Sequence, residues 1–363
     1  LCGIAMNKSL VMALYFLVGS LVGAYMLTYC TQRSRIIKAG VIVGLSNAFL
    51  ILCFKLMEGT LFATEAIGDL LYGTLGGILS GVIVAGLTPL VEAVFNYTTD
   101  IKLLELANLD HPALRELILR APGSYHHSIV VSSLSEAAAK SIHCNPLLAR
   151  VSAYFHDIGR IRVPQYFVEN QGGESLHERL SPRLSSLIIG SHVKEGAEIA
   201  RKYRLPHPIV DVILQHHGTS LIKYFYEKAK EKERPDIDPV KEGDFRYPGP
   251  RPQTREAGIV MLADAVEAAC RSLTDPTPAQ ITGTVSKIIE GIFSDGQLDE
   301  CMLTLRDLHE ISSTFHRVLS GIFHRRVDYP EALPGDTPLR VAPPPLTIIR
   351  LSLIHISEPT RPY

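Results

Sequence analysis

The chain has 363 residues, with 36 basic and 37 acidic side chains, a formal net charge of −1 and a hydrophobic fraction of 46%. This near balance of charge gives no support for binding a nucleic acid polymer through bulk electrostatics. The six cysteines form no CxxC motif or other close pair, which excludes a disulfide framework and a cysteine-based zinc cluster. All fourteen histidines lie at or after His111, so the histidine-bearing part is predicted to be a separate unit from the first hundred residues.

Three long apolar segments lie within residues 1–97, and their only charged residues are Lys38 and Glu92, near segment ends. At about 1.5 Å per residue, each segment is long enough to cross a bilayer as a helix. Three buried helices of a large soluble core are the alternative, which the scarcity of charge disfavours. The predicted transmembrane helices are residues 9–29, 36–54 and 71–95.

The connections between these helices predict their orientation. The first connection is basic, with Arg33 and Arg35, whereas the second holds three acidic residues against Lys55. Because basic loops stay in the cytoplasm, everything from Thr98 onward is predicted to be cytoplasmic in a multi-pass membrane protein. The chain starts at Leu1 in the middle of an apolar pattern, so we expect further membrane helices upstream of this fragment.

Beyond the membrane segments, apolar residues recur at helical spacing and no strand pattern of any length is found, so the predicted fold class is all-α. Prolines and glycines divide this part of the chain. The last thirteen residues resemble a translated sequencing adapter and are excluded from the fold. The predicted divisions are a connector of two short helices at 98–123, a helical domain at 124–330 with an exposed, charged and proline-rich insertion at 227–256, a proline-rich tail at 331–350 and the adapter-derived artefact at 351–363.

Imidazole and carboxylate side chains stand in or at the ends of five apolar helical segments. A buried carboxylate such as Asp157 needs a hydrogen-bond partner, an opposite charge or a metal. Taken singly, the other residues fit ordinary core or surface positions, and Asp264 with Glu267 and Arg271 could form a solvated helix stripe. Taken together, they are a ligand set suited to iron, manganese or zinc, without the thiolates of a structural zinc site. The candidates are His127, His156, Asp157, His192, His216, His217 and Asp264.

The order H…HD…H…HH…D on a helical background resembles the HD-domain metal-dependent phosphohydrolases. Longer phrases, among them APGSYHHSIVV, NPLLARVSAYFHDIGRIRVPQYFVENQ and ILQHHGTSLIKYFY, resemble the bacterial seven-helix membrane proteins with an intracellular HD hydrolase. That group contains the PgpH-type cyclic di-AMP phosphodiesterases. The resemblance covers roughly residues 71–330 and implies that the three apolar segments are the last of seven membrane helices, in the bacterial inner membrane.

The resemblance also implies a site for two divalent metal ions, with Mn²⁺ or Fe²⁺ as the expected cofactors. Adjacent histidines cannot easily point the same way from a regular helix, so either the helix ends there, as Gly218 suggests, or one of the two does not contact the metal directly. His217 therefore ranks below His216 as a ligand. The residues that match one metal are His127, His156, Asp157 and Asp264. The residues that match the second are His192, His216 and His217, with Asp157 as the bridge.

The implied reaction is hydrolysis of cyclic di-AMP to pApA by a metal-bridging hydroxide. Two metals can lower the pKa of water from about 15.7 towards 7 and hold both oxygens of an in-line displacement. Asp157 would carry this chemistry, and Arg160 is positioned to reach a phosphate oxygen. Lys194 is a second cationic candidate, with an ordinary exposed helix lysine as the alternative.

Other functions stay open at this point. A cyclic di-GMP phosphodiesterase carries a Gly-Tyr-Pro signature shortly after the histidine pair, where this chain has HHGTSLIKYFY and places RYPGP much later. Another HD nucleotide phosphohydrolase fits the membrane segments less well. A non-catalytic membrane signal receptor would be expected to lose some ligands. The native metal, the sensed signal, the base contacts and a homodimer are not decided by the sequence.

Overall fold

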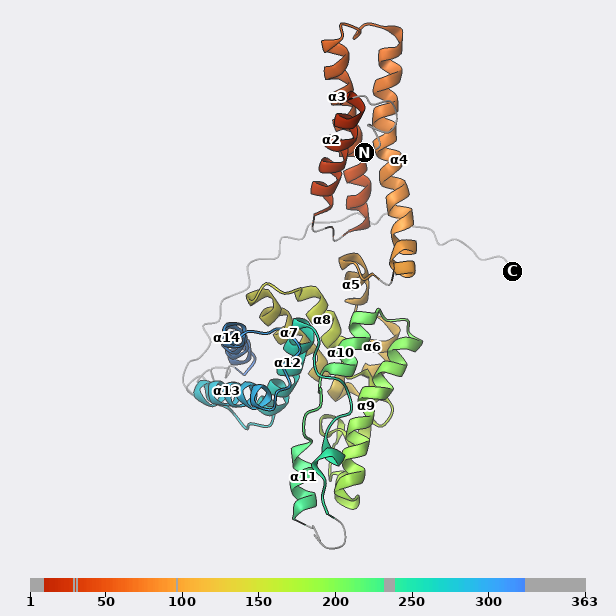
Figure 1. Cartoon of the computed structure of the whole chain (residues 1–363). Coiled ribbons are helices and arrows are strands. Elements are labelled where there is room, and N and C mark those ends of the chain that lie inside the picture. The colour runs from red at the N-terminus through yellow and green to blue at the C-terminus, as the bar shows by residue number, and fades with distance from the viewer. Residues whose placement is uncertain (1–9, 29, 31, 96, 232–238, 324–363) are drawn as a thin grey trace, which may run out of the picture. The chain divides into compact units, whose positions relative to one another are not determined.

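The computed structural model contains only helices as regular elements among the residues it describes (Figure 1). Within that part of the chain, the single β-type pairing is an isolated bridge between Leu221 and Arg246. The all-α fold class is therefore confirmed. The predicted tail at 331–350 and the segment 351–363 lie outside the described residues. The described residues are 10–323 except 29, 31, 96 and 232–238.

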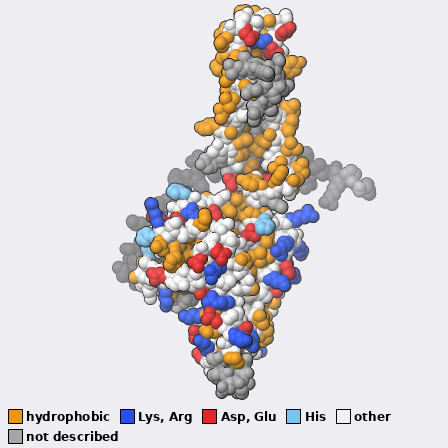
Figure 2. Space-filling view, viewed as in Figure 1, with side chains coloured by type: hydrophobic (Ala, Val, Ile, Leu, Met, Phe, Trp, Pro, Cys, Tyr) orange, Lys and Arg blue, Asp and Glu red, His pale blue; other side chains and the backbone are white. Residues whose placement is uncertain are grey.

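Three long helices open the described chain: α2 (Leu10–Leu27), α3 (Arg33–Met57) and α4 (Thr64–Phe95). By length and composition, α3 and α4 could cross a membrane, whereas α2 is a shorter apolar helix that does not reach the same length. Hydrophobic side chains cover much of their visible surface, and charged side chains concentrate over the rest of the molecule (Figure 2).

Helices α3 and α4 pack backbone against backbone through small residues. A Cβ atom on Gly44 would lie 2.4 Å from the carbonyl oxygen of Thr74, and one on Gly77 would lie 2.2 Å from the amide nitrogen of Gly44. Glycine is the residue that permits this approach, as in many membrane helix pairs.

The interval from Thr98 to Gly123 contains two short helices, α5 (Asp100–Leu106) and α6 (Pro112–Arg120). Each begins at a side-chain cap: Thr99 Oγ1 accepts a hydrogen bond from the amide of Lys102, and His111 Nδ1 accepts one from Ala113. Caps of this kind satisfy amides that lack a partner within the helix.

The remaining helices form a bundle in which polar caps and prolines mark most starts. Asn145, Ser181 and Thr254 each cap the helix that follows them. The elements are α7 (Pro122–Ser141), α8 (Pro146–Phe155), η1 (Ile158–Ile161), η2 (Pro164–Tyr166), η3 (Val168–Asn170), η4 (Leu176–Arg179), α9 (Pro182–Lys202), α10 (His207–Gln215), α11 (Lys223–Lys230), η5 (Glu242–Phe245), α12 (Arg255–Arg271), α13 (Pro278–Ser294) and α14 (Leu305–Ile322), where η denotes a 3₁₀ helix.

Two apolar cores hold the bundle together. One joins α7, α12, α13 and α14 around residues such as Leu262 and Phe315, and the other joins α5, α6, α8, α9 and α10 around Phe155 and Ile213. Helices α8 and α10 contribute side chains to both cores. Buried His156 directly follows the end of α8, and buried His216 directly follows the end of α10, so the cores fix where the polar cluster forms.

The predicted exposed insertion at 227–256 differs from the structure. Part of it, residues 232–238, lies outside the described residues, but Phe245 is buried, and its carbonyl accepts a hydrogen bond from the amide of Ile222. The amide of Tyr247 donates to the carbonyl of Ser220. The prediction of exposure is therefore wrong at Phe245. It followed from the charged and proline-rich composition of the whole segment, in which a single aromatic residue has little weight.

Candidate metal centre

The structure brings all seven candidate ligands into one buried cluster. Asp157 belongs to both of two groups in which the potential ligand atoms lie within 4.8 Å of one another. We call these groups the first position and the second position. The first position is His127, His156, Asp157 and Asp264, and the second position is Asp157, His192, His216 and His217.

Two helix ends deliver four of these side chains. Helix α8 ends at Phe155, directly before His156 and Asp157, and α10 ends at Gln215, directly before His216 and His217. A Cβ atom on Gly159 would lie 1.9 Å from the carbonyl oxygen of His192, so glycine is needed where η1 packs against α9. This packing brings the end of α8 next to His192.

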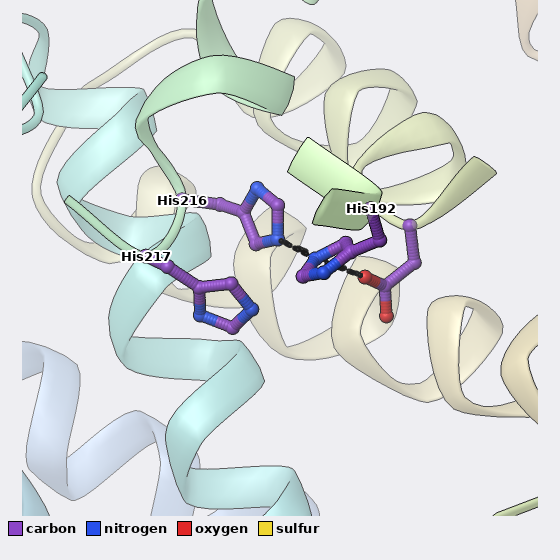
Figure 3. Close-up of side chains that lie close together, drawn as sticks. His192, His216 and His217 are labelled. Carbon is purple, nitrogen blue, oxygen red and sulfur yellow. Dashed lines mark hydrogen bonds and ion pairs between the residues drawn. The ribbon is translucent and has the colours of Figure 1, made fainter. Parts of the chain in front are cut away.

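Adjacent His216 and His217 reach the same group because the helix stops before them. Gly218 has a φ of +52°, in the left-handed region that favours glycine, and the two imidazole centroids lie 4.1 Å apart. Figure 3 shows His192, from α9, facing this pair, and His192 Nε2 lies 3.2 Å from His216 Nε2.

Main-chain carbonyls orient three of the imidazoles in the same way. In each case Nδ1 donates to the carbonyl three residues earlier, because a carbonyl oxygen can only accept. This leaves Nε2 as the atom that faces the cluster. The distances are 2.7 Å from His156 to Ala153, 2.6 Å from His192 to Ile189 and 2.8 Å from His216 to Ile213.

Asp157 is fully buried, and neither carboxylate oxygen has a hydrogen bond of good geometry. Arg160 NH2 lies 2.8 Å from Oδ2, and His156 Nε2 lies 3.1 Å from it. Burial favours the neutral acid, but the charges of Arg160 and His156 outweigh it and hold the pKa of Asp157 well below its usual range. Asp157 is therefore ionised at neutral pH.

The buried atoms without hydrogen-bond partners fit divalent cations. They include His156 Nε2, both oxygens of Asp157 and His217 Nε2. Buried polar atoms are costly unless a hydrogen-bond partner or a cation meets them. Imidazole and carboxylate without thiolate suit iron, manganese or zinc, so the cluster is compatible with divalent metal binding.

The two cationic candidates have different surroundings. Arg160 is buried, pairs with Glu169 and Asp157, and lies over the ring of Phe167 at 4.8 Å. Lys194 is exposed. It follows His192 by two residues on α9, which turns its side chain roughly 200° around the helix axis. The structure thus brings Arg160 to the cluster and does not bring Lys194 there.

Three further residues at the cluster are absent from the predicted set. Glu267, considered above as part of a solvated stripe, is buried, and its Oε2 lies 2.5 Å from His127 Nδ1. Tyr247 stacks on His217 with centroids 4.1 Å apart, and burial raises the pKa of its hydroxyl. Glu169 accepts a hydrogen bond from Ser124 Oγ at 2.6 Å. The spacing of Glu267 from Asp264, one helical turn, was the available signal for the first of these.

Comparisons with known proteins agree with this architecture. A model of the 7TM receptor with intracellular HD hydrolase matches residues 1–99, and a model of the HD domain matches residues 124–269. The cyclic-di-AMP phosphodiesterase PgpH of Bacillus subtilis is 44% identical over 332 residues, which are 91% of this chain and 46% of that protein. PgpH of Listeria monocytogenes is 45% identical over 320 residues, which are 88% of this chain and 44% of that protein.

A solved structure covers the helical bundle. The crystal structure of the L. monocytogenes phosphodiesterase PgpH HD domain in complex with cyclic-di-AMP is 50% identical, with a TM-score of 0.56, and the match covers 60% of this chain and 100% of that one. The helical bundle with its buried histidine–aspartate cluster is thus the fold of an HD domain. The chain belongs to the HD-domain family, and it spans less than half the length of the curated relatives that it matches.

Proposed function

We propose that this protein is a membrane-anchored phosphodiesterase that hydrolyses cyclic di-AMP to pApA with two divalent cations, Mn²⁺ or Fe²⁺. The observation that carries the proposal is the convergence of seven imidazole and carboxylate side chains, six of them buried and His217 partly buried, on two positions that share Asp157. The PgpH relatives and the cyclic-di-AMP complex of a similar HD domain support the choice of substrate.

The protein's own residues have three tasks in this proposal. The seven ligand side chains hold the cations, which would supply a hydroxide nucleophile at neutral pH and neutralise charge on the phosphoryl group. Asp157 divides its two oxygens between the positions. Arg160 keeps Asp157 ionised, and we propose that its guanidinium also contacts a phosphate oxygen of the bound substrate.

Membrane placement is the other part of the proposal. The match of residues 1–99 to the 7TM family and the two candidate membrane helices indicate membrane anchoring. We propose a multi-pass protein of the bacterial cytoplasmic membrane with the HD domain in the cytoplasm. The basic residues Arg33 and Arg35 in the first turn of α3 support this orientation.

The test is a two-substrate assay of the purified chain in detergent. We expect Mn²⁺- or Fe²⁺-dependent conversion of cyclic di-AMP to pApA, followed by chromatography, and slower turnover of cyclic di-GMP. Asp157→Ala should lose bound metal and activity together, whereas the exposed residue Lys194 should tolerate alanine. Equal or faster turnover of cyclic di-GMP would overturn the substrate, and activity in a sample without bound metal would overturn the mechanism.

A further inference from the structure

Four of the five cluster histidines, all but His217, are oriented at Nδ1 by one of two kinds of partner. His156, His192 and His216 each donate Nδ1–H to a main-chain carbonyl. His127 instead presents Nδ1 to the side-chain carboxylate of Glu267, at 2.5 Å. An ionised carboxylate accepts more strongly than a neutral carbonyl, so His127 differs from the other three in the group behind it.

Glu267 is built into this position by helix α12. Asp264 and Glu267 lie one turn apart on the helix, and each is 5% exposed. Asp264 Oδ1 lies 2.9 Å from His127 Nε2, while Glu267 meets the opposite ring nitrogen. Arg271 NH1 lies 3.7 Å from Glu267 Oε1 and provides partial charge compensation on the far side. Helix α12 therefore places one carboxylate next to each ring nitrogen of His127.

A carboxylate behind a ligand histidine has defined consequences for metal binding. It fixes the proton on Nδ1, leaves Nε2 as the ligand atom and increases the electron density that the imidazole offers to a cation. The first position also holds two carboxylates, Asp157 and Asp264, whereas Asp157 is the one carboxylate of the second position. Both differences favour a divalent cation at the first position.

We propose that Glu267 is a positioning residue that makes the first position the tighter of the two cation sites, so that it fills before the second. This inference rests on the two-cation centre of the proposed function. It adds the order in which the two positions fill, and it attributes that order to Glu267, which belongs to neither ligand group.

The experiment measures Mn²⁺ binding to the full chain in detergent by competition with a fluorescent chelator. His216→Ala removes a ligand of the second position and leaves the first intact. In this background, Glu267→Gln should weaken Mn²⁺ binding about 10–100-fold. Glutamine keeps the size and an acceptor oxygen, so the change removes the charge alone. Glu267→Asp, which retains the charge, should weaken binding less than Glu267→Gln.

The matched control uses a chain without the first-position histidine. In a His127→Ala background, adding Glu267→Gln should leave the remaining Mn²⁺ affinity unchanged within about twofold, because the partner of Glu267 is gone. A purely structural role for Glu267 predicts equal losses in both backgrounds. Thermal unfolding of each apo variant, followed by circular dichroism, shows whether the fold is retained.

Three results would overturn the inference. They are equal Mn²⁺ affinity with and without Glu267→Gln in the His216→Ala background, equal losses in both backgrounds, and tighter binding in the His127→Ala chain than in the His216→Ala chain. Two-phase Mn²⁺ binding that Glu267→Gln does not change would refute this inference and leave the proposed metal centre intact. No Mn²⁺ binding by the unaltered chain would refute both.

Discussion

At the scale of single residues, the cluster places ionised carboxylates against imidazoles of contrasting basicity. Burial lowers the pKa of His156, but Asp157 and Asp264 outweigh it and raise that pKa to about 10. His216 is also buried, and there burial dominates and lowers the pKa to about 4. At neutral pH and without metal, His156 is therefore a cation and His216 is neutral.

This contrast predicts that cation binding at the first position releases protons. A ligand imidazole must lose its Nε2 proton before it can coordinate, so His156 gives up a proton while His216 has none to give. Affinity at the first position should rise with pH by about tenfold per unit for each proton released, up to a pH near the His156 pKa of about 10. Calorimetry in buffers of different ionisation enthalpy measures the released protons. A pH-independent affinity between pH 6 and 8 would contradict this assignment.

A second prediction at this scale concerns Glu169. Burial favours its neutral form, but Arg160 and the hydroxyl of Ser124 hold the pKa of Glu169 below its usual range, so it is a charged partner for Arg160. Glu169→Gln should reduce kcat/KM about 10–100-fold, since a buried charged hydrogen bond contributes about 1.5–3 kcal/mol. Metal content should stay unchanged, which separates this effect from loss of the centre. Glu178→Gln, at an exposed position on η4, is the control.

At the scale of elements, the site depends on where helices stop and how closely they approach. The ends of α8 and α10 deliver four ligand side chains, and Gly159 lets η1 contact the backbone of α9. On the other side, Gln297 Oε1 accepts a hydrogen bond from the amide of Thr219 and so holds the turn that follows His217. The cluster is thus fixed by backbone contacts between elements as well as by side-chain packing.

Gly159→Ala tests this element contact. The added methyl would lie 1.9 Å from the carbonyl oxygen of His192, so α9 must shift. We expect a loss of about 1–3 kcal/mol in the free energy of unfolding and weaker metal binding. Gly190→Ala is the matched control on α9, because its methyl would approach only Pro248 Cδ, at 4.0 Å. Denaturant unfolding and metal titration check both variants. Equal stability of the two variants would contradict the role given to Gly159.

How much of the structure can be predicted from the sequence depends on whether a feature is set within one helix or by contacts between helices. Helices can be predicted because an apolar stripe is local in the chain, and the ligand set follows from a motif that resembles a known family. The surroundings of Lys194 and Glu267 cannot be predicted in this way, because both depend on which face of a helix meets a neighbour. Lys194 is close to His192 in sequence yet exposed, and Glu267 is charged yet buried. The burial of Phe245 likewise cannot be predicted, because the charged residues around it in the sequence indicate an exposed segment.

At the scale of the whole molecule, the proposed orientation predicts which side of the membrane each connection occupies. Phe62, in the connection between α3 and α4, is 97% exposed, so a cysteine there is open to reagents. In intact cells, a membrane-impermeant maleimide should label Phe62→Cys, while Cys30 in the connection between α2 and α3 should react only after permeabilisation. The parent chain, with its own cysteines, is the control. Labelling of Cys30 in intact cells would reverse the orientation.

The glycine contacts between α3 and α4 have a mechanical consequence. Gly44 and Gly77 bring the two backbones so close that sliding one helix by a single residue would drive a side chain into the opposite main chain. These contacts oppose such a one-residue slide, so we expect the two helices to move as a unit. A push applied at the turn between the two helices would reach their other ends as a tilt or a displacement of both together, without being absorbed by slippage between them.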